Sequence, residues 1–555
     1  MKYSRCGQLV GESTRGVVRL LGLSALGTVL ARADVPPLAE ESGLQPKTPT
    51  LYLNPPGSGE LPLNNGRVQG IGIGIGSNGN VMVGWEDDGA DLTDYRGVWM
   101  LIDPNGSVLT PEAAIPSLVT PSINIFSRYR AFFRQNESPT PANTAYGPII
   151  KANLFGDGLG FGATAFSLGL EIAELAQVNF QASLGGAAGE FTAVQLVDNE
   201  GQPSAETLSG YSELDADRPG DVRSGDWDFL SNGNLVIVSE SRQAQDLVEL
   251  FGGEIPANHA AFRILKPDGT VVKPLTLVGE TPVKTELWQG VGVTKDGFAV
   301  RFAKGTTGRA TVRLFKNDGT PVTGDIDLGT LAGSEIYATG GRGDSVGFHG
   351  NGNDAYVVVA KTRDPDPEIN VNTPYVMVIN ADGTLRYARK VADDFPKANT
   401  ARVDAAMTPD GRVVVAFDGS QFSTTRLVQA RLFNADGSPM SPTFLVSEKE
   451  TPTTATSDSR HPRVAWRGNQ IAIAWESTSF PNVSSRVVAL RIFELAGNRT
   501  TLDFRVMGGD MTLTWEGGGA LQSSTDPGGP WQDVPGASSP FAIRMTSDHN
   551  YFRVR

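Results

Sequence analysis

The sequence predicts an all-β protein, a seven-bladed β-propeller followed by a small C-terminal β-module. A short apolar segment that ends in a glycine turn recurs seven times along the chain. A second apolar segment precedes each copy, and in the clearest cases it begins after an Asn-Gly or Asp-Gly pair. With 65 Gly and 35 Pro among 555 residues, the chain is also rich in turn-forming residues. Many short strands joined by such turns are typical of propellers and sandwiches.

Residues 1–33 are predicted to be a signal peptide rather than part of the fold. Basic residues precede the apolar run 20–30, and Ala31-Arg32-Ala33 places small side chains where a signal peptidase cleaves. We expect cleavage after Ala33 and a secreted protein that is extracellular or held at the cell surface. The alternative is an uncleaved N-terminal anchor, although the run is short for a bilayer span. No later run of 18 or more apolar residues predicts a transmembrane segment.

Residues 64–506 are predicted to form the propeller, after a linker or closing strand over residues 34–63. The repeated apolar hairpins span residues 98–106, 193–201, 262–269, 312–319, 376–383, 430–437 and 489–497. The clearest turns before them are Asn78-Gly79, Asn232-Gly233, Asp296-Gly297 and Asp410-Gly411, each followed by an apolar segment. Continuous apolar segments suit strands buried on both faces, and Asx-Gly pairs suit tight hairpins.

Each unit therefore contains four antiparallel strands, with two tight turns and one long loop between the second and third strands. Seven consecutive units of this kind fit the blades of a propeller. An array of β-sandwiches is the competing interpretation, but such an array needs linkers between its modules. No Pro/Gly-rich linker separates these units.

The repeats resemble a known group of propellers. The outer hairpin Arg431-Leu432-Phe433-Asn434-Ala435-Asp436-Gly437 is similar to that of divergent seven-bladed propellers of secreted bacterial proteins. This resemblance covers about residues 64–506. It implies the fold without a particular activity, because propellers carry many unrelated functions.

Residues 507–555 are predicted to form a small C-terminal β-module. The segment contains the turn Gly529-Pro530-Trp531 and ends in the strand-like Tyr551-Phe552-Arg553-Val554. These features resemble the small C-terminal β-modules of many secreted bacterial proteins. The resemblance implies a role in sorting or in attachment to the cell surface.

The composition and motifs exclude several classes of function. A formal net charge of −14 argues against a nucleic-acid-binding protein, because phosphate contacts need clustered Lys and Arg. The single cysteine, Cys6, lies in the predicted signal peptide, which argues against a disulfide scaffold or a Cys-ligated metal. No Gly-x-Ser-x-Gly, phosphate-loop or His-Glu-x-x-His motif occurs, so esterase, NTPase and zinc-protease functions have no local support.

The topology of a blade restricts where chemistry is expected. Both tight turns of each blade lie on one face of the propeller, and the long loops and blade connections lie on the other. Binding residues concentrate on variable loops held by a rigid scaffold, so this loop-rich face is the candidate functional face. Residues just after the second strands are expected to line the channel mouth there: Glu86, Asp87, Glu240, Lys304, Lys361, Asp418 and Glu476.

The carboxylates of this set, together with His461, are the candidate ligand-binding residues. Carboxylates around one mouth suit an acid/base pair or a cation site, although they also suit solvated strand ends in an acidic protein. His461 enters the last blade on the loop-rich face and is the candidate histidine base. The alternative for His461 is packing against a neighbouring blade. His259 and His349 are expected in loops.

Calcium is the one cofactor that the sequence suggests. Asp215, Asp217 and Asp221 are the candidate ligands, because their spacing partly matches an EF-hand loop. Pro219 and Asp226 stand where that loop has an oxygen ligand and its final Glu. A solvated turn is therefore the alternative.

The sequence thus predicts a secreted or surface-attached binding protein whose loop-rich face engages a glycan or a protein, and enzymatic activity stays open. Trp85 and Trp475 either stack on sugar rings or belong to the core. The alternative function is a polysaccharide lyase or glycoside hydrolase that uses carboxylates or His461 on the same face. For such an enzyme the acidic face suits neutral or cationic sugars better. A cluster of Arg would favour a uronate or sulfated substrate, but Arg128, Arg130, Arg242 and Arg363 lie in long loops mostly of different blades. Two carboxylates about 5–9.5 Å apart would favour glycoside hydrolysis.

Overall fold

The computed structural model describes most of the chain from Pro36 onwards. The described residues are 36–53, 69–87, 96–114, 149–155, 161–167, 191–209, 222–241, 259–280, 286–305, 308–337, 347–363, 371–395, 400, 402–419, 426–447, 459–477, 487–495, 503–507, 510–514, 520–525, 530–538, 540–544 and 551–554. Within them, no helix is long and apolar enough to cross a membrane.

Seven antiparallel sheets follow one another along the chain, and each is one blade of a propeller. Blade 1 contains β3 (Gln69–Ile75), β4 (Val81–Asp87), β5 (Arg96–Ile102) and β6 (Val108–Ala114). Blade 2 contains β7 (Ile149–Ala152), β8 (Phe161–Ser167), β9 (Phe191–Val197) and β10 (Pro203–Ser209). Blade 3 contains β11 (Val222–Phe229), β12 (Leu235–Ser241), β13 (His259–Leu265) and β14 (Val271–Leu277).

The later blades repeat this order. Blade 4 contains β15 (Glu286–Val293), β16 (Gly297–Lys304), β17 (Arg309–Lys316) and β18 (Ile326–Asp327), followed by α6 (Leu328–Ala332) and η5 (Glu335–Tyr337). Blade 5 contains β19 (Phe348–Gly350), β20 (Ala355–Arg363), β21 (Asn372–Asn380) and β22 (Leu385–Lys390). Blade 6 contains β23 (Val403–Met407), β24 (Val413–Gly419), β25 (Leu427–Phe433) and β26 (Phe444–Leu445), and blade 7 contains β27 (Ser459–Arg467), β28 (Gln470–Ser477) and β29 (Val487–Leu495). The predicted all-β, seven-bladed fold is confirmed.

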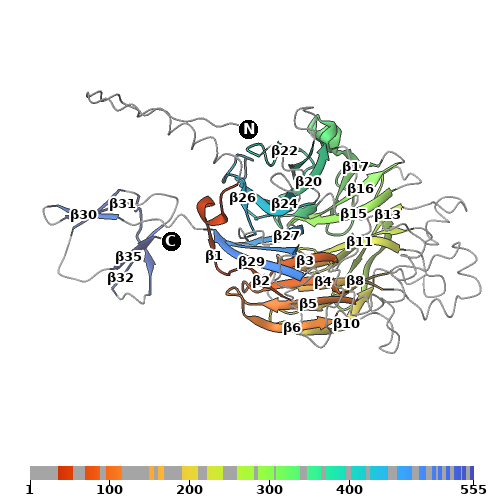
Figure 1. Cartoon of the computed structure of the whole chain (residues 1–555), viewed down its shortest axis with the longest axis horizontal. Helices are drawn as coiled ribbons and strands as arrows, with labels where there is room; N and C mark the ends of the chain where they lie inside the picture. Colours follow the sequence, from red (N-terminus) through yellow and green to blue (C-terminus); the bar gives the residue numbers. More distant parts are fainter. Residues whose placement is uncertain are drawn as a thin grey trace, which may run out of the picture. The chain divides into compact units, whose positions relative to one another are not determined.

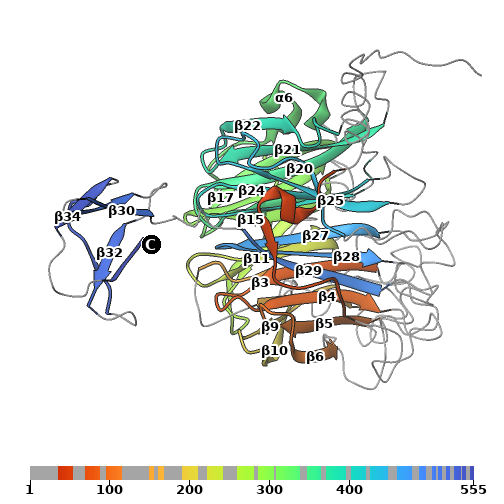
Figure 2. The same cartoon turned by 60° about the vertical axis from the view of Figure 1, so that its left-hand side comes forward.

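The first strands of successive blades form a ring around the central channel. Contacts between neighbouring first strands run in the order β3, β7, β11, β15, β19, β23 and β27, and β27 contacts β3 again. Figure 1 shows β27 and β3 side by side, and Figure 2 shows the blades from a second direction. The side chain of Arg463 in β27 donates to the carbonyl of Ile71 in β3 at 3.2 Å. Arg467 reaches the carbonyl of Asn153, which follows β7, at 2.8 Å. Blade 7 is thus tied to blades 1 and 2.

The N-terminal segment supplies the outer edge of blade 7. After η2 (Ala39–Ser42), β1 (Leu44–Pro46) and β2 (Leu51–Tyr52) both pair antiparallel with β29. Arg491 of β29 donates to Glu40 at 3.0 Å. These residues fill the place of a fourth strand in the last blade, so the propeller includes chain that precedes residue 64.

The core consists of the faces that adjacent blades press together. Continuous Val and Ile segments such as β24 are buried along their whole length, as strands covered on both faces require. Trp85 and Trp475 are buried in two of these inter-blade clusters. Both are therefore core residues rather than platforms for a sugar.

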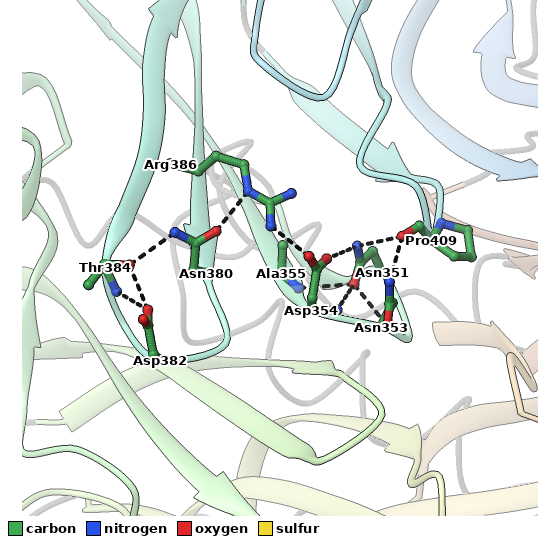
Figure 3. Close-up of polar contacts among 9 residues, drawn as sticks. All are labelled: Asn351, Asn353, Asp354, Ala355, Asn380, Asp382, Thr384, Arg386 and Pro409. Carbon is green, nitrogen blue, oxygen red and sulfur yellow. Dashed lines mark hydrogen bonds and ion pairs between the residues drawn. The ribbon is translucent and has the colours of Figure 1, made fainter.

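Three of the four predicted Asx-Gly turns are held by hydrogen bonds of their own side chains, whereas at Asp296-Gly297 the glycine is already the first residue of β16. Gly79, Gly233 and Gly411 all have φ between 84° and 91°, a conformation that glycine adopts without steric cost. In blade 5, Asn351 Oδ1 accepts from the backbone N–H groups of Asn353, Asp354 and Ala355 (Figure 3).

Side chains around this blade 5 turn also join it to its surroundings. Asn353 donates to the carbonyl of Pro409 in the next blade, and Arg386 links Asp354 to Asn380 (Figure 3). The polar groups drawn there bond to one another, which suits a structural role for this end of the blades.

The C-terminal residues form two small sheets of their own. One contains β30 (Asp503–Met507), β31 (Asp510–Thr514) and β34 (Phe541–Arg544), and the other β32 (Leu521–Ser524), β33 (Gln532–Asp533) and β35 (Tyr551–Val554). Leu513 and Leu521 form their buried core. The expected boundary at residue 507 lies too late, because β30 pairs with β31.

Candidate functional site

Three of the predicted site residues come together where blades 6 and 7 meet. Asp418 lies near the end of β24, Glu476 near the end of β28, and His461 near the start of β27. All three lie at the strand ends where the long connections begin, which we call the loop end. Asp418 and Glu476 are fully buried and not at an open mouth, because neighbouring blades cover both faces of the second strands.

The other predicted residues are less well defined. Glu86 and Asp87 end β4, and Glu240 in β12 pairs with Arg223 in β11, but the side chains of Glu86, Asp87 and Glu240 lie outside the described part. Asp215, Asp217 and Asp221 also lie outside it. In the described part, no group of three or more His, Cys, Asp or Glu residues is arranged to hold a metal ion. The calcium site remains a prediction.

The imidazole of His461 is held by a buried carboxylate. His461 Nδ1 lies 2.5 Å from Glu476 Oε1, and the Glu476 side chain is 0% exposed whereas the His461 side chain is 14% exposed. An ionised carboxylate at Nδ1 favours the tautomer with its proton on that nitrogen. Nε2 is then the nitrogen with the lone pair, as a general base requires.

The backbone of His461 has an unusual conformation. Among the described residues it is the only non-glycine with positive φ, at 51°. The pairing of β27 with β28 shifts between Arg460 and Arg463, so His461 and Pro462 form a bulge opposite Trp475. Bulges redirect side chains, and strained backbone is frequent at functional sites. Here the bulge turns His461 toward Glu476.

Asp418 holds the same bulge from the neighbouring blade. Its Oδ1 accepts from the backbone N–H of Arg402 at 2.8 Å, and its Oδ2 accepts from the backbone N–H of His461 at 3.4 Å. Arg426 Nη1 lies 3.7 Å from Asp418 Oδ2. Asp418 is fully buried, so it orients the site and leaves ligand contact to more exposed groups.

Three arginines lie at the same loop end as this site, although the protein as a whole is acidic. Arg402, Arg426 and Arg460 are half-buried at the loop end of blades 6 and 7, and the Arg426 side chain is 30% exposed. Lys361 is half-buried near the end of β20 in blade 5. A histidine base among cationic groups suits an anionic ligand.

Sequence reasoning missed a second group of charged side chains within the channel. Lys151 Nζ in β7 lies 3.4 Å from Asp226 Oδ1 and 3.9 Å from Asp228 Oδ2, both in β11. Asp226 Oδ2 also accepts from the backbone N–H of Val291 in β15 at 2.8 Å. The EF-hand comparison placed Asp226 in a calcium loop, but it lies in a strand and bonds to the flanking blades.

The environment of this group shifts its pKa values. Burial raises the pKa of Asp228 to about 6, against the attraction of Lys151 and with the negative charge of Asp226 adding to the rise. Burial works to lower the pKa of Lys151, but Asp226 and Asp228 outweigh it and the pKa is raised. Lys151 therefore stays charged, while Asp228 titrates close to neutrality.

His349 and Asp404 form another pair between first strands that the sequence analysis did not predict. His349 was expected in a loop but lies in β19, the first strand of blade 5. Its Nε2 lies 2.9 Å from Asp404 Oδ1 in β23, and Asp404 Oδ2 accepts from the backbone N–H of Val464 in β27 at 3.0 Å. Burial alone would raise the pKa of Asp404, but the charge and hydrogen bond of His349 hold it below its usual value.

One sequence signal points to these aspartates. Asp226 lies four residues before Leu230, which opens the blade 3 turn, and Asp404 lies four residues before Thr408, which opens the blade 6 turn. In β23, Asp404 is the single charged residue of an otherwise apolar strand, which is unusual for a core position. In β11 the signal is weaker, because Arg223 and Asp228 are also charged. The basic side chains that pair with the two aspartates, which lie in other blades, are not marked in this way.

Comparison with known proteins finds only distant similarity to solved structures. No protein-family model and no curated protein matches the sequence. A protein of unknown function from Dyadobacter fermentans has 12% identity and a TM-score of 0.37, over 81% of this chain and 99% of its own. An α-L-arabinanase from Penicillium chrysogenum, in complex with arabinobiose, has 8% identity and a TM-score of 0.40, over 81% and 99%.

A further solved structure is the β-propeller domain of the Trilobed protease from Pyrococcus furiosus. It has 10% identity and a TM-score of 0.35, over 78% of this chain and 95% of its own. Values this low do not transfer a substrate or a mechanism. Any function must therefore be argued from the residues of this chain.

Proposed function

We propose that this protein cleaves a uronate-containing polysaccharide by β-elimination, with His461 as the general base. The observation that carries the proposal is the His461 imidazole, held at Nδ1 by the buried Glu476 and redirected by a strained bulge. This proposal develops the enzymatic alternative of the sequence analysis. The purely ligand-binding interpretation gives no reason for a strained, carboxylate-bound histidine.

The chemistry of uronates matches a histidine base. The ring carbon next to a uronate carboxylate carries an acidic proton, which His461 Nε2 removes. The electron pair of that C–H bond forms a C=C bond, and the bond from the next ring carbon to the glycosidic oxygen breaks. The imidazolium then returns its proton to the leaving oxygen, so the reaction consumes no water.

The surrounding charges favour elimination over hydrolysis. A glycoside hydrolase needs two carboxyl groups that flank the scissile bond. Asp418 and Glu476 are fully buried and bonded to Arg402, Arg426 and His461, so they suit support of the base. The half-buried arginines nearby suit attraction of the uronate carboxylate.

Export belongs to the same proposal, because polysaccharides of this kind lie outside the cell. The predicted signal peptide, residues 1–33, is proposed to direct secretion. The C-terminal β-module is proposed to sort the protein or attach it to the cell surface.

The test is a substrate screen with the full chain. Pectate, alginate, glycosaminoglycans and neutral glucans are incubated with the protein, and product is followed by the ultraviolet absorbance of the new C=C bond. We expect product from at least one uronate polymer and none from neutral glucans. His461→Ala is expected to lower kcat about 10²–10⁴-fold.

Glu476→Gln and Glu494→Gln form a matched pair in the same sheet. Glu476→Gln removes the charge that orients His461 and is expected to lower kcat about 10²-fold. Glu494 is exposed and lies at the opposite end of blade 7, opposite Gln470, so Glu494→Gln should leave kcat unchanged. Tight binding of a glycan without product, or full activity of His461→Ala, would contradict the proposal.

A further inference from the structure

We propose that Asp404, which is paired with His349, is a positioning residue for His461. Asp404 lies in blade 6 and His461 in blade 7, and the two are linked through the backbone of β27. This inference rests on the proposed function for its kinetic consequence. Its structural part, that Asp404 sets the environment of His461, stands without any substrate.

The bulge at His461 needs support from its surroundings. A non-glycine residue with φ of 51° is strained, and the residue before a proline is further restricted, as His461 is by Pro462. Such a conformation persists only where neighbouring groups fix the chain on both sides of it. On the N-terminal side, Asp418 and Glu476 bind the backbone and the imidazole of His461.

On the C-terminal side, the support comes from Asp404. The regular pairing of β27 with β28 resumes at Arg463, and the next residue, Val464, donates its N–H to Asp404 Oδ2 at 3.0 Å. Because β27 is the first strand of its blade, its channel-facing N–H groups have no further strand of that blade beside them. The Asp404 carboxylate supplies the acceptor instead.

Asp404 is itself rigidly held. Its side chain is almost fully buried, and its other oxygen, Oδ1, lies 2.9 Å from His349 Nε2 in blade 5. A hydrogen bond to a charged acceptor is stronger than one between neutral groups. Asp404 therefore fixes β27 relative to two other blades, three residues after His461.

The molecule contains a matched control for this role. Asp226 occupies the same place in blade 3 and accepts in the same way from the N–H of Val291 in blade 4. Its loss removes an equivalent bond between first strands without touching β27. Lys151 and Asp228 also interact electrostatically with Asp404 and His349, so the comparison with Asp226→Ala isolates the hydrogen bond to β27 rather than the charge of the group.

The experiment follows the histidine imidazoles directly by NMR. The chain has four histidines, so isotope-labelled histidine gives few ring C–H signals, which single His→Gln variants assign. In Asp404→Ala we expect the His461 signal to shift and kcat on the uronate polymer to fall about 10–10²-fold with little change in KM. Asp404→Asn keeps an acceptor for Val464 and should restore both toward wild type.

Two results would overturn the proposal. One is a His461 signal in Asp404→Ala that stays at its wild-type position, and the other is an equal shift in Asp226→Ala. Should Asp404→Ala fail to fold, Asp404→Glu keeps the charge but lengthens the side chain in a closely packed place, and an unshifted His461 signal there would equally refute it.

The two proposals fail in different ways. If no glycan is cleaved but the His461 signal shifts in Asp404→Ala, the positioning role stands and the proposed function is wrong. If His461→Ala abolishes cleavage while Asp404→Ala has wild-type kcat, the function stands and the positioning role is wrong.

Discussion

Asp226 in blade 3 and Asp404 in blade 6 hold the same place in their blades, yet their surroundings differ. Each accepts a hydrogen bond from the first strand of the next blade and pairs with a basic side chain from the preceding one. The partner is a lysine in one case and a histidine in the other. Only the blade 3 group includes a second carboxylate, Asp228.

In both groups, the position of the aspartate in the repeat determines its hydrogen bond to the next first strand. Side chains from other blades determine the charge around the aspartate. Near Asp404, His349 holds the pKa of the carboxyl below its usual value. In blade 3, two carboxylates share one lysine, and burial raises the pKa of Asp228 to about 6. The stability that each group contributes therefore depends on pH in opposite directions.

The largest expected difference is in the free energy of unfolding after removal of either aspartate. Asp404→Ala leaves the N–H of Val464 without its acceptor and is expected to lower the free energy of unfolding by about 3 kcal/mol at pH 7. Asp226→Ala is expected to cost only about 1–2 kcal/mol, because Asp228 remains beside Lys151 as its counter-ion. Urea unfolding followed by tryptophan fluorescence measures both. Equal losses would contradict this difference in roles.

The next effect is the pH dependence of stability at Asp228. Because its folded pKa of about 6 exceeds the unfolded value of 3.8, the folded state keeps a proton that the unfolded state releases. Stability therefore falls as pH rises from about 4 to about 6. Asp228→Asn should raise the free energy of unfolding by about 3 kcal/mol at pH 8 and change it little at pH 4.

Asp404 provides the opposite case for the same measurement. Its folded pKa lies below the unfolded value, so its contribution is complete above the unfolded pKa and is lost as pH falls through the folded one. Near neutral pH, the free energy of unfolding of Asp404→Asn should lie below that of wild type and should approach it in acid. That of Asp228→Asn should lie above wild type near neutral pH and should also approach it in acid. If the difference in free energy of unfolding from wild type changed with pH in the same direction for both variants, the two groups would not differ in the way described.

The smallest expected effect is that of Glu40, whose partner Arg491 makes a main-chain hydrogen bond that is repeated in the neighbouring blade. Arg431 and Arg491 each donate to a main-chain carbonyl, of Val391 and Val446, and each stacks on the Phe two residues later. Arg491 also pairs with Glu40, whose side chain is 41% exposed.

Because that ion pair is partly solvated, Glu40→Gln should lower stability by at most about 0.5 kcal/mol. Arg491→Ala should cost about 2 kcal/mol through the lost carbonyl bond and stacking. Thermal unfolding of the two variants checks this order. A larger loss for Glu40→Gln would show that the pair, rather than the carbonyl bond, closes blade 7.

The sequence predicted the candidate site only in part. It identified His461, Glu476 and Asp418, because the hairpin repeats place the ends of second strands and the entry to the last blade on one face. It treated Asp418 and Glu476 as exposed, since a single strand does not reveal that the next blade covers its outer face. It placed His349 in a loop, because the Asn351-Gly352 turn gives little sign of the strand before it.

By itself the sequence determined the fold, because turn residues and apolar segments act over a few neighbouring positions and repeat seven times. The pairing of β1 and β2 with β29, and the meeting of Lys151 with Asp228 and of His349 with Asp404, were decided by tertiary structure. These contacts join residues far apart along the chain, and they form only when the ring of first strands closes. Burial in that ring then sets which carboxyl groups keep their protons, which no local pattern encodes.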